Sequence, residues 1–155
     1  MKKCLTMLSA AAMLGLGSLA AQAADIARVV YHVDYADPDR YSLTLTSVNN
    51  MLNAYEQDLR EYDVEIVFVG PGARFVTNDK KAGTDKRLEA KRAELKGRLE
   101  ALNKVRGVKL KVCNNTLSDM GIAKEALYPG VEVVPSGVAY IADQQAKGAA
   151  YLKIQ

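Results

Sequence analysis

Short runs of apolar, mostly β-branched residues alternate along the chain with amphipathic helical patterns. Apolar residues spaced three and four apart predict helices, and short continuous apolar runs predict strands that are buried on both faces. The predicted strands are residues 25–33, 64–69, 108–113, 131–134 and 149–154. The predicted helices are residues 37–60, 85–105, 116–127 and 136–148. This alternation predicts an α/β fold, a three-layer α/β/α domain with a five-stranded, mostly parallel sheet.

Several predicted helix boundaries carry residues with a known capping role. Asp37 is followed by a proline, and both residue types favour the first helical turn. Thr116 has an aspartate three positions later, which resembles a capping box. Ser136 is expected to cap the last helix, and Gly148 to end it. Residues 73–84 show no regular pattern and predict an irregular loop.

The first 23 residues resemble a secretory signal peptide. Lys2 and Lys3 precede an apolar, alanine-rich segment over residues 5–20, and Ala21-Gln22-Ala23 forms a cleavage pattern. The apolar segment is too short for the usual transmembrane helix of about 20 residues. Residues 24–155, a length of 155 − 23 = 132, are therefore predicted to form one exported, periplasmic domain with no membrane anchor.

Charge and motifs narrow the classes of ligand that the mature chain is expected to bind. The whole chain has 21 basic and 18 acidic residues, and loss of the two signal lysines lowers the net charge from +3 to +1. Such a balance gives no electrostatic reason to expect a nucleic acid or an anionic membrane as partner. No Walker or dinucleotide-binding fingerprint is present, so no cofactor is expected. One cysteine and one histidine are too few for a zinc site.

Cys113 is the residue with the clearest chemical potential. It is the only cysteine outside the signal segment, because Cys4 lies within residues 1–23, so it has no partner for an internal disulfide. It ends a predicted strand just before a predicted helix, where free N–H groups favour a thiolate. Asn114, Asn115 and Thr116 are expected to support the sulfur by hydrogen bonds. The alternative is a small buried residue that serves only in packing.

Two other parts of the chain contain candidate site residues, because they follow or end strands and can lie at the same edge of the sheet as Cys113. His32, the only histidine, lies near the end of the first strand and approaches Cys113 if the first and third strands are neighbours. A hydrogen-bonded histidine at the sheet edge is the simpler interpretation. Gly70 and Gly72 follow the second strand and are expected either to offer backbone N–H groups to the cleft or to form a plain tight turn.

Several segments together resemble the DsrE/DsrF-like family. They are VVYHVD (29–34), SVNNMLNAY (47–55), VFVGPGARF (67–75), KVCNNTL (111–117), VEVVPSGVAYIADQQAKG (131–148) and AYLKI (150–154). The resemblance implies assembly into trimers or hexamers and, in the better-understood members, transfer of a persulfide between proteins. The cysteine that matches the motif is Cys113. Relatives often carry a histidine before the Gly-Pro-Gly turn, where this chain has Val69.

Two functions follow as expectations from the sequence. The first is a periplasmic sulfur carrier in which Cys113 receives a sulfane sulfur from a donor protein and passes it to an acceptor protein. The second is a non-catalytic, oligomeric protein that binds a small ligand or a partner, with Cys113 as a structural residue. The surroundings of the sulfur atom are expected to separate the two.

Overall fold

A five-stranded parallel sheet lies at the centre of the computed structural model, which describes residues 26–155. The predicted signal peptide lies outside the described residues. The strand order is β4-β3-β2-β1-β5, and every neighbouring pair is parallel. The strands are β1 Ala27–Val33, β2 Tyr62–Phe68, β3 Lys109–Cys113, β4 Val131–Val134 and β5 Ala150–Leu152. The five predicted strands and their parallel arrangement are therefore confirmed.

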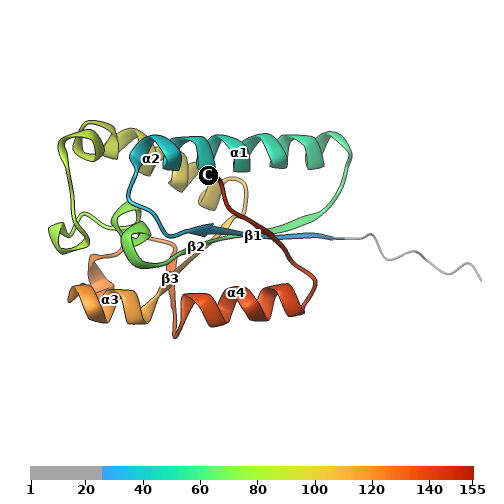
Figure 1. The fold of residues 1–155 in the computed structure, drawn as a ribbon. Coiled ribbons are helices and arrows are strands. Elements are labelled where there is room, and N and C mark those ends of the chain that lie inside the picture. The colour runs from blue at the N-terminus through green and yellow to red at the C-terminus, as the bar shows by residue number, and fades with distance from the viewer. Residues whose placement is uncertain (1–25) are drawn as a thin grey trace, which may run out of the picture.

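Helices cover both faces of the sheet, which confirms the three-layer α/β/α prediction (Figure 1). The long helices α1 (Pro38–Gln57) and α2 (Lys86–Lys104) lie on one face, and the shorter α3 (Asn114–Met120) and α4 (Gly137–Ala146) lie on the other (Figure 1). Among the described helices, none combines the length and apolar character that a membrane crossing requires.

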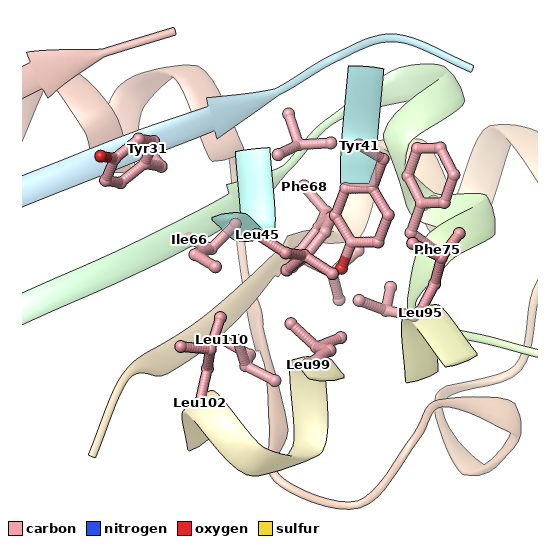
Figure 2. Close-up of a cluster of buried hydrophobic side chains, with 14 of the residues drawn as sticks. Tyr31, Tyr41, Leu45, Ile66, Phe68, Phe75, Leu95, Leu99, Leu102 and Leu110 are labelled. Atoms are coloured by element: carbon pink, nitrogen blue, oxygen red, sulfur yellow. The ribbon is translucent and has the colours of Figure 1, made fainter. Parts of the chain in front are cut away.

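The main core lies between the sheet and the two long helices (Figure 2). Alternate residues of β1 and β2 point to this side because successive side chains of a strand face opposite ways. At its centre, Tyr41 of α1 stacks on Phe75 with ring centroids 4.0 Å apart and an interplanar angle of 12°. Tyr41 is fully buried, yet its hydroxyl has no hydrogen-bond partner. The desolvation of this hydroxyl is therefore not compensated by a hydrogen bond.

The capping residues predicted the starts of α1 and α4 correctly and the start of α3 incorrectly. The Asp37 carboxylate accepts from the backbone N–H groups of the first turn of α1, and the Ser136 hydroxyl accepts from that of Ala139 in α4. The prediction that Thr116 starts a helix running to residue 127 is wrong. Helix α3 begins two residues earlier, with Cys113 at the N-cap position, and it ends at Gly121, whose φ of 64° breaks the helix.

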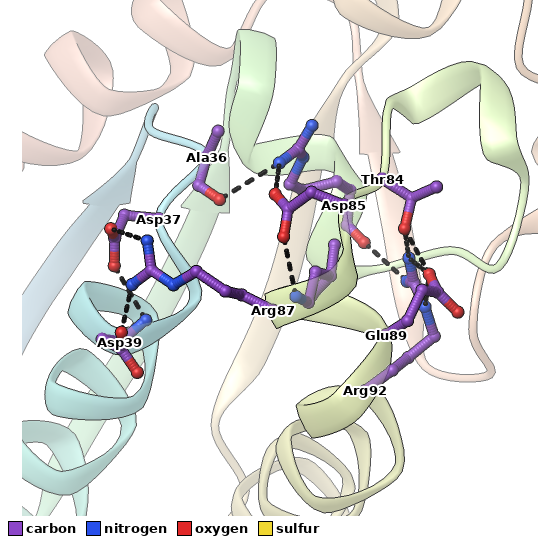
Figure 3. A network of polar contacts seen from close by, with 10 residues as sticks. Ala36, Asp37, Asp39, Thr84, Asp85, Arg87, Glu89 and Arg92 are labelled. Carbon is purple, nitrogen blue, oxygen red and sulfur yellow. Dashed lines mark hydrogen bonds and ion pairs between the residues drawn. The ribbon is translucent and has the colours of Figure 1, made fainter.

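The irregular segment between β2 and α2 is confirmed, and polar contacts hold it in place (Figure 3). It contains two 3₁₀ turns, η1 (Gly70–Phe75) and η2 (Lys80–Ala82). Arg92 of α2 donates to the backbone oxygens of Arg74 and Thr77 at 3.1 and 2.9 Å. Arg87 forms ion pairs with Asp37 and Asp39, which join the start of α2 to the start of α1 (Figure 3). The contact of Arg92 with Arg74 holds η1 on α2, and η1 also packs against β3 and α3.

Candidate functional site

Cys113 lies at the carboxyl edge of the sheet, where β3 ends and α3 begins. Its backbone is extended, with φ −70° and ψ 123°, and it occupies the N-cap position of α3. The residue is only 5% exposed and makes no disulfide. The predicted place of the thiol is therefore confirmed, although the sulfur is less accessible than a surface thiol.

The groups around the sulfur favour its negatively charged form. Burial alone raises the pKa of the Cys113 thiol. Hydrogen bonds from the backbone N–H groups of Gly137, Thr116 and Asn115, and from the Thr116 hydroxyl, outweigh burial and bring that pKa below its ordinary value. The N–H groups belong to the first turns of α3 and α4. Both helices therefore present their N-terminal ends, which carry positive partial charge, to the sulfur. The site therefore stabilises a thiolate, which is the reactive form of cysteine.

Thr116 connects this sulfur to the loop after β2. Its Oγ1 accepts a hydrogen bond from the backbone N–H of Gly70 at 2.8 Å. A hydroxyl has one proton, so acceptance from Gly70 leaves that proton available to donate to the Cys113 sulfur. Thr116 is 6% exposed, so water competes little for either bond. The structure thus brings together three of the predicted site residues.

The glycines of the loop do not offer free N–H groups to a ligand. The N–H of Gly70 is bound to Thr116, and that of Gly72 donates to the backbone oxygen of Val69 at 3.1 Å. A Cβ atom on Gly72 would lie 2.1 Å from the backbone oxygen of Val33, so a glycine is needed there for close packing on β1. The interpretation of this segment as a structural turn is the better one.

His32 is separated from the thiol because β2 lies between β1 and β3, so the condition for its approach to Cys113 is not met. The register places His32 level with Lys111, two residues before Cys113 and two strands away, which is about 10 Å across the sheet. Its Nδ1 lies 3.0 Å from the hydroxyl of Tyr151, and its Nε2 is buried with no hydrogen-bond partner. Burial lowers the pKa of His32.

The asparagines contribute less than expected through their side chains. Asn115 acts through its backbone N–H while its side chain is exposed, and Asn114 is half-buried at the first position of α3. The residue that the sequence did not single out is Gly137 at the start of α4. Ser136 marks that helix start, but only the pairing of β3 with β4 brings it beside Cys113.

A cavity of about 330 Å³ lies elsewhere, between α1 and α2. Its lining includes the apolar side chains of Leu45, Leu102 and Val105 and the guanidinium groups of Arg98 and Arg106. Both guanidinium groups bind side chains of the protein itself: Arg98 contacts Ser42 and Thr46, and Arg106 contacts Glu56, Asn49 and Asn53. Among the described residues, no group of three or more His, Cys, Asp or Glu side chains is placed to hold a metal ion.

Comparison with known proteins identifies the family. The chain is similar to the protein of unknown function MTH1491 from Methanobacterium thermoautotrophicum, with 29% sequence identity, a TM-score of 0.65 and coverage of 82% of this chain and 98% of that chain. It shares its fold with the ychN protein from E. coli, at 19% identity and a TM-score of 0.58, over 83% of this chain and 99% of that chain. No curated protein matches it in sequence. Residues 24–154 match the model of the DsrE/DsrF-like family, so the chain belongs to that family, which is associated with sulfur relay.

Proposed function

We propose that this protein is a sulfur carrier in which Cys113 holds a persulfide. The observation that supports this most strongly is the place of Cys113, at the N-cap of α3 and in close contact with the first residue of α4, where backbone N–H groups and the Thr116 hydroxyl lower the pKa of its thiol. A cysteine that serves only in packing needs no such donors, and burial among apolar side chains would raise its pKa. Membership of a family associated with sulfur relay supports the same conclusion.

The proposed reaction is an exchange of one sulfur atom. The Cys113 thiolate attacks the outer sulfur of a donor persulfide or polysulfide. The sulfur–sulfur bond of the donor breaks, and the donor leaves with the electron pair, as a thiolate from a persulfide or as a polysulfide shortened by one sulfur atom, and then takes a proton from water. Cys113 is left as a persulfide, and an acceptor thiolate removes its outer sulfur by the same reaction. Sulfane sulfur is transferred at constant total oxidation state, so no external oxidant is needed.

The same proposal places the protein in the periplasm as a homo-oligomer, a trimer or hexamer. The signal-like residues 1–23 support export, and the family resemblance supports assembly. N-terminal sequencing of the protein from a periplasmic extract is expected to begin at Ala24. Light scattering of the purified protein is expected to give three or six times the mass of one chain. A chain that retains Met1 would refute export, and a monomer would refute assembly.

Intact mass spectrometry tests the sulfur step directly. In the chain from Ala24 onward, Cys113 is the only cysteine, so every thiol modification reports on it. Incubation with inorganic polysulfide is expected to add the mass of one sulfur atom, and a small thiol is expected to remove it. Cys113→Ser is the matched control and should show no gain. A native protein that gains no sulfur, although its thiol is alkylated, would refute the proposal.

A second candidate function is binding of a small ligand by a non-catalytic protein. Two observations favour it: Cys113 is only 5% exposed, and the cavity between α1 and α2 has the size and the largely apolar lining typical of small-molecule sites. Native mass spectrometry of freshly purified protein is expected to show a retained small molecule. In this case Cys113→Ala should lower the free energy of unfolding and leave the retained ligand in place.

A further inference from the structure

The last crossover of the chain brings a second helix to the Cys113 sulfur. Strand β4 lies at one edge of the sheet and β5 at the other, so α4 must cross the strands between them. It contacts β3, β2, β1 and β5 in turn. Because β4 pairs with β3, with Val134 opposite Cys113, the chain leaving β4 starts α4 above the end of β3.

At Gly137 the first turn of α4 packs closely against Cys113 and the chain at the end of β2. A Cβ atom built on Gly137 would lie 2.6 Å from Cγ2 of Val69 and 3.1 Å from Cβ of Cys113. The φ angle of Gly137 is not in the left-handed region, so its backbone conformation does not require glycine. The requirement is space: without a side chain, the first turn of α4 settles on Cys113.

This close approach has a chemical consequence, because the backbone N–H of Gly137 is among the groups that lower the pKa of the Cys113 thiol. Neither α3 nor α4 carries an acidic residue in its first turn. The nearest charged side chain on the same face of β3 is Lys111, which pairs with Glu132 of β4 at 2.6 Å. With Lys111 thus paired, the groups that lower the pKa of the Cys113 thiol are the backbone N–H groups of the two helix starts and the Thr116 hydroxyl.

We propose that Gly137 is a positioning residue: its missing side chain lets the start of α4 donate to Cys113 and thereby sets the fraction of the thiol that is ionised. The proposal deepens the proposed function, since it concerns the group that carries the sulfur. It also stands apart from that function, because ionisation of the thiol is measurable without any sulfur transfer.

The test is the rate of Cys113 alkylation by iodoacetamide as a function of pH. Gly137→Ala is expected to move the profile to higher pH and to lower the rate on the acidic side about tenfold, the effect of losing a hydrogen bond to a charged acceptor. Adding Val69→Ala to Gly137→Ala removes the 2.6 Å contact and is expected to restore part of the rate. Ser136→Ala removes the side-chain cap of α4 without adding volume, so it should lower thermal stability and leave the profile unchanged.

A wild-type profile in folded Gly137→Ala would overturn the proposal. If that variant does not fold, the wild-type protein provides the decisive measurement by NMR. The amide signal of Gly137 is expected to titrate with Cys113, and this titration should vanish in Cys113→Ser. An amide of Gly137 that does not respond, while that of Thr116 does, would also overturn the proposal. Failure of polysulfide to load the wild type would refute the sulfur carrier and leave the role of Gly137 intact.

Discussion

Replacement of Thr116 by valine tests the hydrogen-bond chain that joins the loop after β2 to the thiol. Valine keeps the shape of threonine and removes both the donor to Cys113 and the acceptor for the N–H of Gly70, which lies 2.8 Å away. A hydrogen bond to a charged group contributes about 1.5–3 kcal/mol. Thr116 and Cys113 are 6% and 5% exposed, so solvent screens this contribution little. Thr116→Val should therefore lower the thiolate fraction about 10- to 100-fold at a pH below the pKa of Cys113.

Alkylation of Cys113 as a function of pH measures this effect, with Thr116→Ser as the control that retains the hydroxyl. The profile of Thr116→Val is expected to move to higher pH, and that of Thr116→Ser to stay near the wild type. Urea unfolding should show a loss of about 1–3 kcal/mol for valine, because the N–H of Gly70 loses its acceptor.

The sign of the pH dependence gives a second check on the same variant. The native pKa of Cys113 is lowered, so the thiolate stabilises the fold above the ordinary thiol pKa, and this contribution is lost as pH falls through the native pKa. The stability difference between wild type and Thr116→Val should accordingly grow with pH. Identical alkylation profiles for wild type and Thr116→Val would refute the role of the hydroxyl.

Three further predictions concern the scaffold. Tyr41→Phe should raise the free energy of unfolding by about 1 kcal/mol in urea titrations, because it removes a buried hydroxyl without a partner. Gly72→Ala should lower the free energy of unfolding by about 3 kcal/mol, because its Cβ would lie 2.1 Å from the backbone oxygen of Val33. Gly97→Ala lies in an exposed and open part of α2 and should raise the free energy of unfolding by about 0.5–1 kcal/mol. The pKa of His32 is lowered by burial, so the unfolded chain binds the proton more readily and stability should fall as pH drops below about 6.5. His32→Gln should remove that part of the pH dependence, and an unchanged curve would contradict it.

Some features that depend on neighbouring residues in sequence were predictable, such as the start of α1, but the two ends of α3 were not. The start of α1 follows from Asp37 and the proline after it, which act within one turn. The start of α3 was misjudged because Thr116 and the aspartate after it look like a capping box, while the helix begins directly after β3. The role of Gly121 in ending that helix depends on a left-handed backbone that the sequence pattern did not reveal.

The site likewise combines local features, which were predicted, with contacts between distant parts of the chain, which were not. The position of Cys113 at a strand end is local, and it was predicted. The contact between Gly70 and Thr116 joins residues 46 positions apart, and the approach of Gly137 depends on β4 lying next to β3. His32 was considered a neighbour of Cys113 only on the condition that β1 pairs with β3, and the insertion of β2 between them separates the two.

A lowered thiol pKa affects the two halves of sulfur transfer in different ways. When Cys113 attacks a donor, a lower pKa raises the thiolate fraction but makes each thiolate a weaker nucleophile, by a Brønsted factor of about 0.4–0.5. When an acceptor removes the outer sulfur, Cys113 is the leaving group, and a lower thiol pKa makes this transfer faster. The donors around the sulfur therefore favour release more than capture. For a carrier this bias is useful, because the sulfur atom must be passed on and not retained. We accordingly expect Thr116→Val to slow transfer to an acceptor thiol, and to speed loading by polysulfide slightly, when both are measured above the thiol pKa, where ionisation is complete.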